Sequence, residues 1–140
     1  MVDELLSAMP RVAPNVRPVV LLVDSDLGLL FWLGRKLDEA GYAAFPARNA
    51  ADGLSLVAQL NLPVSLAILD AALEGGAHLV EQLRVDPRRP KVILLVEIED
   101  AQSEIPHDAQ CLRPDGLQAG LEAEWLRLIE KLLAERAAAH

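Results

Sequence analysis

The segment at residues 64–70 constrains the possible folds most, because an apolar run there ends abruptly in one carboxylate, Asp70. Five of its first six residues are apolar, and small residues and two glycines follow as far as Gly76. A short, continuous apolar run bounded by turn residues is typical of a strand buried on both faces. Asp70 therefore either lies where open α/β sheets bind their ligands, just past the carboxyl end of a strand, or simply caps the next helix.

Similar apolar runs predict four further strands, and the segments between them predict helices. The expected strands are 19–23, 42–47, 64–70, 91–96 and 109–112, and the expected helices are 27–40, 49–60, 77–84 and a last one of about twenty residues from 115. Apolar strands that alternate with helices predict a parallel sheet covered on both faces. Five such units in 140 residues predict a flavodoxin-like, doubly wound α/β fold with strand order 2-1-3-4-5.

Polar residues before three of the helices match known capping patterns. Asp26 is expected to cap the first helix, and Asn49 with Asp52 three residues later resembles a capping box. Asp115 with Gln118 has the same spacing and predicts the start of the last helix.

The N-terminal residues 1–17 are predicted to form an extension or linker, because Pro10, Pro14 and Pro18 forbid a long helix there. The rest of the chain, residues 18–137, is long enough to form one domain with a real core.

The composition argues against several function classes. A net charge of −8 argues against a nucleic-acid partner, since phosphate binding needs a basic surface. The densest apolar stretch is far too short to cross a bilayer, so no membrane insertion is expected. Because the N-terminus carries Asp3 and Glu4 and no apolar signal core, a cytoplasmic location is predicted.

Charged residues are expected to converge at one edge of the predicted sheet. Its strand order makes the first and third strands neighbours, so Asp24 and Asp70 end adjacent strands, and Arg113 follows the fifth strand. Carboxylates at one edge repel one another, and a hard divalent cation such as Mg²⁺ relieves this repulsion. One hypothesis is a metal site of Asp24, Asp26 and Asp70 in which Asp70 accepts a phosphoryl group and Arg113 binds the phosphate. The alternative is a salt bridge from Arg113 to Asp70 or Asp24, with no metal.

These segments resemble the receiver domain of bacterial response regulators. The resemblance covers about residues 18–136 and depends on the order and spacing of 19–26, the series Leu30, Leu33 and Leu37 with Gly41 and Tyr42, 67–70 and 112–114. It implies a five-stranded α/β signalling domain, not an enzyme, whose third-strand aspartate takes phosphate from a histidine kinase. Asp70 matches that acceptor, and Asp24 matches the first residue of the family's acidic pair. The implied partner is a histidine kinase or a downstream signalling protein.

The chain departs from the family pattern at several positions. Ser25 stands at the second acidic position, Val96 where a hydroxyl residue is expected, and Arg113 where a lysine is expected. The segment from Val96 to Arg113 spans 17 positions (113 − 96) and is shorter than usual, so the fourth helix is expected to be short or absent. Val96 cannot donate a hydrogen bond to a phosphoryl oxygen, and arginine is not equivalent to lysine. The chain is therefore interpreted as an atypical or pseudo-receiver that acts mainly through protein–protein interaction and binds Mg²⁺ weakly.

Two other functions remain open. The first is a phosphorylation-competent receiver that accepts phosphate on Asp70. The second is a small phosphatase, because Asp24-Ser25-Asp26 also resembles the D-x-D motif of the haloacid-dehalogenase type, with Asp24 as nucleophile and Asp26 as acid/base. Such enzymes need a further lysine and a later acidic pair, for which the candidates are Lys91 and the group Glu97, Glu99 and Asp100.

The first predicted helix carries more apolar residues than one buried stripe needs. Leu29, Trp32, Leu33 and Leu37 fall at helical spacing and are expected to face the core. Leu30 and Phe31 then point outward and are the predicted partner surface, with a homodimer as one form of that partnership. The alternative is that the N-terminal extension folds back over this face through Leu5, Leu6 and Met9.

Overall fold

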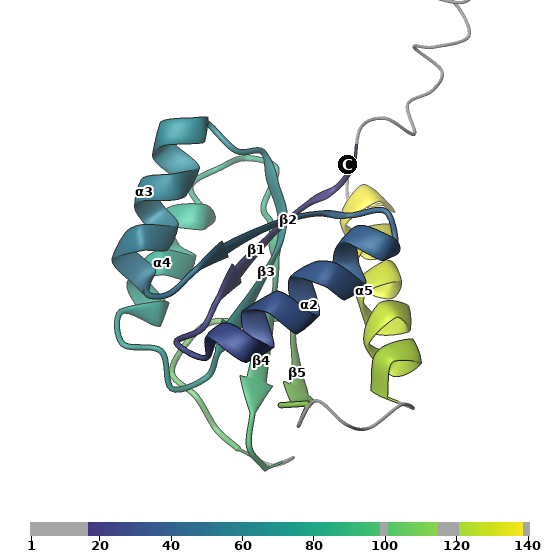
Figure 1. Cartoon of the computed structure of the whole chain (residues 1–140). Helices are drawn as coiled ribbons and strands as arrows, with labels where there is room; N and C mark the ends of the chain where they lie inside the picture. Colours follow the sequence, from purple (N-terminus) through teal and green to yellow (C-terminus); the bar gives the residue numbers. More distant parts are fainter. Residues whose placement is uncertain (1–16, 99–100, 115–120, 139–140) are drawn as a thin grey trace, which may run out of the picture.

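The computed structural model describes residues 17–98, 101–114 and 121–138. Its five strands form one parallel sheet in the order β2-β1-β3-β4-β5 (Figure 1). The strands are β1 (Val19–Val23), β2 (Ala43–Ala47), β3 (Val64–Asp70), β4 (Lys91–Val96) and β5 (Ala109–Leu112). The helices in the described ranges are α2 (Leu27–Glu39), α3 (Ala50–Leu60), α4 (Gly76–Leu83) and α5 (Leu121–Ala138). The predicted doubly wound α/β fold and its strand order are confirmed.

Helices cover both faces of the sheet: α2 and α5 pack on one face, and α3 and α4 on the other (Figure 1). Alternate residues of a strand point to opposite faces, so Val20 and Leu22 of β1 pack with α2 and α5. Leu21 and Val23 point the other way and pack with α3 and α4. Because both faces are buried, the central strands are apolar at nearly every position, which is why they could be recognised in the sequence.

Side-chain caps set the start of two helices, as predicted. The Asp26 carboxylate accepts a hydrogen bond from the backbone N–H of Leu29 at 3.1 Å, at the start of α2. Asn49 Oδ1 accepts one from the N–H of Asp52 at 2.8 Å, at the start of α3. These bonds satisfy amide groups that have no partner within the helix. The capping pattern of Asp115 and Gln118 lies outside the described residues.

The expectation of a short or absent fourth helix needs correction. The described ranges contain four helices, so a fourth helix in chain order is present as α5. The segment between β4 and β5, to which the expectation referred, has no helix within its described residues 97–98 and 101–108. Its Ile105 is buried, at 6 % exposure, in the cluster that packs between the sheet and α4. An apolar side chain from an irregular segment thus covers part of this face of the sheet.

Of the predicted extension 1–17, only Arg17 belongs to the described residues. The domain bounds 18–137 therefore stay a prediction. No helix in the described ranges combines the length and the apolar character that a membrane crossing requires.

Candidate functional site

Asp24 follows directly on β1 and is almost fully buried, with 2 % of its surface exposed. Its backbone N–H donates to the carbonyl of Ala47 at 3.1 Å, which continues the pairing of β1 with β2 by one residue. Its Oδ1 accepts a hydrogen bond from the N–H of Asp26 at 2.8 Å. A backbone N–H group of the turn after β1 therefore holds the Asp24 carboxylate in place. A buried carboxylate requires a positive partner nearby.

Arg113 is that partner. Its guanidinium donates to both oxygens of Asp24, from Nη1 to Oδ2 at 2.5 Å and from Nη2 to Oδ1 at 3.3 Å. Such a two-pronged contact matches the planar fork of arginine to the carboxylate. Asp24 raises the pKa of Arg113, mainly through these hydrogen bonds, although burial of the guanidinium acts in the opposite direction. The backbone N–H of Arg113 donates to the carbonyl of Val96 at 2.8 Å, which fixes its place beside the end of β4.

The same guanidinium also lies near two further carboxylates. Its Nη1 is 3.6 Å from Asp70 Oδ1, and its Nη2 is 3.9 Å from Asp26 Oδ2. Asp70 ends β3 with its side chain 25 % exposed, and its Oδ1 accepts a hydrogen bond from the N–H of Ala72 at 3.0 Å. One arginine thus faces three carboxylates at the carboxyl edge of the sheet. The expected convergence of Asp24, Asp70 and Arg113 is confirmed, whereas their roles in phosphate or metal chemistry stay predictions.

Val96 lies beside this cluster at the end of β4 and is 2 % exposed. Its side chain belongs to the apolar cluster on the α3 and α4 face of the sheet. A hydroxyl residue at this place could donate to a phosphoryl oxygen, but the valine side chain offers no donor.

The carboxylates do not form a metal site in this structure. Among the described residues, no group of three or more His, Cys, Asp or Glu side chains is placed to hold a metal ion. Both oxygens of Asp24 bond the Arg113 guanidinium, and Oδ1 also accepts the N–H of Asp26. The guanidinium therefore supplies positive charge beside the Asp24 carboxylate.

The phosphatase alternative finds no support in the geometry. Asp24, its candidate nucleophile, is buried and bonded through both oxygens. Lys91, its candidate lysine, begins β4 and so lies at the opposite end of the parallel sheet. Lys91 Nζ is 3.9 Å from Asp108 Oδ1 instead. Of the candidate acidic group, residues 99–100 lie outside the described ranges.

Of the two residues that were expected to point outward from α2, one is exposed, and their role as a partner surface stays a prediction. Phe31 is 78 % exposed, but Leu30 is only 6 % exposed, so the expectation that Leu30 points outward is wrong. The residues buried on α2 are Leu29, Leu30, Leu33 and Leu37. Trp32, expected in the core, is only half-buried. Leu30 nevertheless contributes to a surface hollow beside Phe31 and Pro46.

A link between the Asp70 loop and the segment before β5 was missed in the sequence. The Ser103 hydroxyl donates to the carbonyl of Ala71, the residue after Asp70, at 3.4 Å, and accepts from the N–H of Ile105 at 3.2 Å. Ile105 also packs on Gly76, where an added Cβ would lie 2.5 Å from Ile105 Cδ1. The glycine that starts α4 leaves room for this isoleucine. The only signal in the sequence was that Ile105 is one of a few apolar residues in a mostly polar segment.

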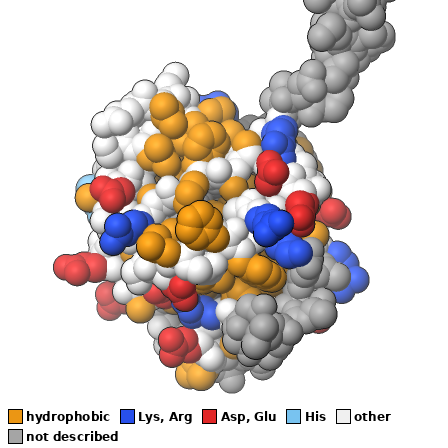
Figure 2. All heavy atoms as spheres, viewed as in Figure 1, with side chains coloured by type: hydrophobic (Ala, Val, Ile, Leu, Met, Phe, Trp, Pro, Cys, Tyr) orange, Lys and Arg blue, Asp and Glu red, His pale blue; other side chains and the backbone are white. Residues whose placement is uncertain are grey.

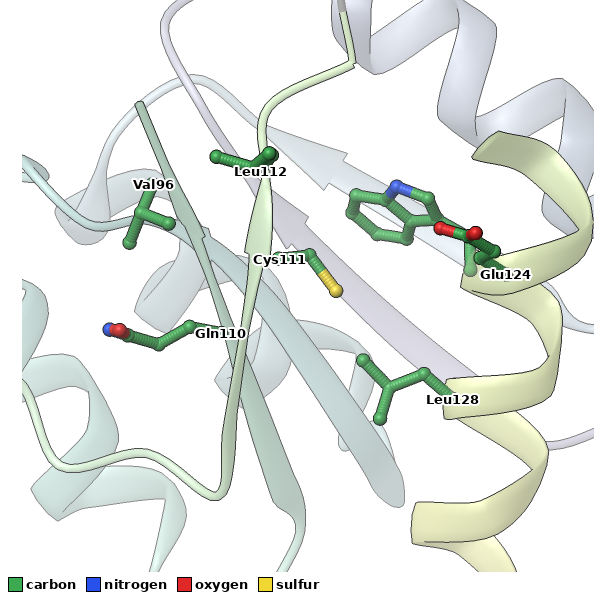
Figure 3. A pocket seen from close by; sticks show the side chains of 7 residues that line it. Val96, Gln110, Cys111, Leu112, Glu124 and Leu128 are labelled. Atoms are coloured by element: carbon green, nitrogen blue, oxygen red, sulfur yellow. The ribbon is translucent and has the colours of Figure 1, made fainter. Parts of the chain in front are cut away.

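A pocket of about 430 Å³ lies between β5 and α5 (Figure 3). The Cys111 side chain points toward α5, whereas Gln110 points to the opposite side of β5 (Figure 3). Gln110 Nε2 donates to the carbonyl of Ala101 at 2.8 Å. The polar groups of this pocket therefore do not converge on one point, and we assign it no chemistry.

Comparison with known proteins supports the fold. No protein-family model matches the sequence, and no curated protein matches it. A solved CheY-like receiver domain from Methanospirillum hungatei matches with a TM-score of 0.71 and 24 % identity, covering 89 % of this chain and 99 % of its own. The signal receiver domain of an HD domain-containing protein from Pseudomonas fluorescens matches with a TM-score of 0.70 and 26 % identity, covering 88 % and 91 %.

The chain has the fold of a response-regulator receiver domain. Another solved structure of this fold is the response regulator TrrA from Thermotoga maritima, in complex with Mg²⁺ and beryllium fluoride. It matches with a TM-score of 0.62 and 22 % identity, covering 82 % of this chain and 98 % of its own. In this receiver fold, Asp24 ends up beside Asp70 because β1 and β3 are adjacent.

Proposed function

We propose that this chain is an atypical receiver domain that acts in signal transduction through protein–protein interaction and does not depend on phosphorylation of Asp70. One observation carries the proposal: the Arg113 guanidinium binds both oxygens of Asp24 and lies 3.6 Å from Asp70. A side chain of the protein itself therefore pairs with Asp24 and offsets part of the negative charge of the site. Mg²⁺ has to displace this side chain before it binds Asp24, Asp26 and Asp70, so Mg²⁺ binding is weak.

The surroundings of the site support the same proposal. Val96 offers no hydroxyl to a phosphoryl group on Asp70. The segment that leads to β5 is attached to the domain at several points. Ile105 is buried, and Asp108 Oδ2 accepts the backbone N–H of Val92 at 2.8 Å and lies 3.3 Å from Arg84. A phosphoryl group on Asp70 would therefore have no hydroxyl at position 96 to bind. Residues 97–98 and 101–108 contain no helix that such a bond could move.

The proposal includes the domain bounds, location and partners. Residues 18–137 form the domain, in the cytoplasm of a bacterium, and the domain is not an enzyme. Its partner is a histidine kinase or a downstream signalling protein, and the exposed Phe31 on α2 is the centre of the docking surface. A nucleic-acid partner is not proposed, because the net charge of −8 opposes phosphate binding.

A phosphorylation-competent receiver is the second candidate. The observation that favours it is the 25 % exposure of the Asp70 side chain at the carboxyl end of β3. A metal that displaced Arg113 would supply charge stabilisation at this carboxylate, and Arg113 would then be available to bind the incoming phosphate.

Incorporation of labelled phosphate from acetyl phosphate with Mg²⁺ tests the proposal. We expect no stable label on the native chain. The double variant Val96→Thr/Arg113→Lys, which introduces the hydroxyl and lysine of the receiver pattern, is the positive control. Label on the native chain that is lost in Asp70→Asn would contradict the proposal and support the second candidate.

A further inference from the structure

An apolar groove of about 840 Å³ runs between α2 and the edge strand β2. Its apolar lining comes mainly from Leu30, Phe31, Trp32 and Pro46. A second hollow of about 250 Å³ shares Phe31 and Pro46 with the groove and is also bordered by Leu27 and Arg48. Hydrophobic side chains gather over this face of the molecule (Figure 2). A continuous apolar surface of this kind is typical of a site that another segment or molecule covers.

The groove also carries positive charge. Arg35 lines the larger hollow and Arg48 the smaller one, and both residues are exposed. Neither arginine forms an ion pair with a carboxylate in the part of the chain that the structure describes. A fitting occupant therefore combines apolar side chains with carboxylates.

The chain enters its described part at one end of this groove. Arg17 Nη1 lies 3.0 Å from Asp38 Oδ1, and Arg17 Nη2 donates to the carbonyl of Asp38 at 2.7 Å. Asp38 belongs to α2 and lines the groove. The next residue, Pro18, accepts a hydrogen bond from the N–H of Ala43 in β2 at 2.9 Å. Arg17 thus contacts α2 and Pro18 contacts β2, the two elements that form the groove. Residues 1–16 come directly before them in the chain.

We propose that residues 1–16 fold back along this groove within the same molecule. The order of apolar and acidic side chains in this segment matches the order of the apolar and basic residues along the groove. Leu5, Leu6 and Met9 supply the apolar contacts to Phe31 and its neighbours, and Asp3 and Glu4 reach Arg48 at the far end. This proposal goes beyond the proposed function, because it names what covers the α2 surface in the absence of a partner.

The length of the segment is sufficient. α2 has 13 residues, which corresponds to about 20 Å of helix. Leu6 is 11 positions before Arg17 (17 − 6), and 11 extended residues span up to about 36 Å. The leucines therefore reach Phe31 even if part of the segment is not extended.

A spin label on the full-length chain tests this contact directly. Ser7→Cys in a Cys111→Ser background places a single nitroxide label between Leu6 and Met9, and ¹⁵N NMR reports its neighbours. We expect the amides of residues 28–35 and 44–48 to lose intensity in the labelled molecule, and those near Val85 to keep it. A second sample mixes labelled ¹⁴N chain with unlabelled ¹⁵N chain, and we expect no loss there.

Matched variants complete the test. Phe31→Glu is expected to restore the intensity of the groove amides, whereas Val85→Glu, at a residue with a similar 75 % exposure, leaves the loss unchanged. Unchanged amide shifts in β3 and β4 confirm that each variant is folded. A comparable loss of intensity in the mixed sample would show that a second copy occupies the groove and would overturn the proposal. No loss in either sample would also overturn it.

Discussion

The guanidinium of Arg113 binds both carboxylate oxygens of Asp24, a residue 89 positions earlier in the chain. Asp24 is 2 % exposed, so this ion pair sits at the inner end of the acidic site. Asp70 and Asp26 lie at 3.6 Å and 3.9 Å from the same guanidinium. One guanidinium thus offsets part of the negative charge of three carboxylates, most closely that of Asp24.

Removal of this arginine is expected to destabilise the domain. In Arg113→Ala the buried Asp24 carboxylate loses its positive partner, which costs about 2–4 kcal/mol of unfolding free energy, because breaking one half of a buried pair leaves an uncompensated charge. Arg113→Lys keeps the charge but not the two-pronged contact and is expected to lose less. Urea denaturation measures both variants. The control is Arg88→Ala, whose exposed pair with Asp86 contributes less. Equal losses in Arg113→Ala and Arg88→Ala would contradict the account of Asp24.

Ile105 is expected to contribute to stability as a core residue although it lies in an irregular segment. Ile105→Ala removes a buried side chain that packs on Gly76, at a cost of about 2–4 kcal/mol. Ile98→Ala, in the same connection but with 66 % exposure, is the matched control and is expected to change little. Thermal unfolding followed by circular dichroism compares the two. If both substitutions lowered the melting temperature equally, Ile105 would not hold this segment on the sheet.

Cys111 is expected to react slowly while the chain is folded. Burial, and to a smaller extent the charge of Glu124, raise the pKa of the thiol from 9.0 to about 11. Two pKa units leave about 100-fold less thiolate at pH 8, and the thiolate is the reactive form. Alkylation by iodoacetamide should therefore be slow at pH 8, accelerate as the pH rises toward 11, and become fast in urea. Equal rates for the folded and unfolded chain at pH 8 would show that the thiol is not protected.

Much of the fold was predictable because its signals are local. The apolar run that ends at Asp70 became β3 with the predicted bounds, and the caps at Asp26 and Asn49 lie where expected. The orientation of α2 was only partly predictable. This helix is buried on more than one side: Leu30 faces a hollow bordered by β2, and Trp32 lies beside Trp125 of α5. A single stripe of apolar residues at helical spacing in the sequence does not indicate burial on more than one side of the helix.

The state of the acidic site could not be derived from the sequence. Strand order alone brought Asp24, Asp70 and Arg113 to one edge, but it left open whether the arginine pairs with a carboxylate or serves a bound phosphate. That choice depends on distances of a few ångströms. The contacts of Ser103 with Ala71 and of Ile105 with Gly76 were also hidden, because they join segments 32 and 29 positions apart (103 − 71 and 105 − 76).

Titration of Mg²⁺ into the native chain and into Arg113→Ala, followed by calorimetry without phosphate, tests whether Arg113 takes the place of a metal ion at this site. We expect weak binding by the native chain, with a dissociation constant well above the micromolar range. We expect Arg113→Ala to bind Mg²⁺ at least about tenfold more tightly, because the ion no longer competes with a positive charge for Asp24 and Asp70. Arg88→Ala should match the native chain. Micromolar affinity in the native chain, or no gain in Arg113→Ala, would contradict the claim that Arg113 takes the place of the metal.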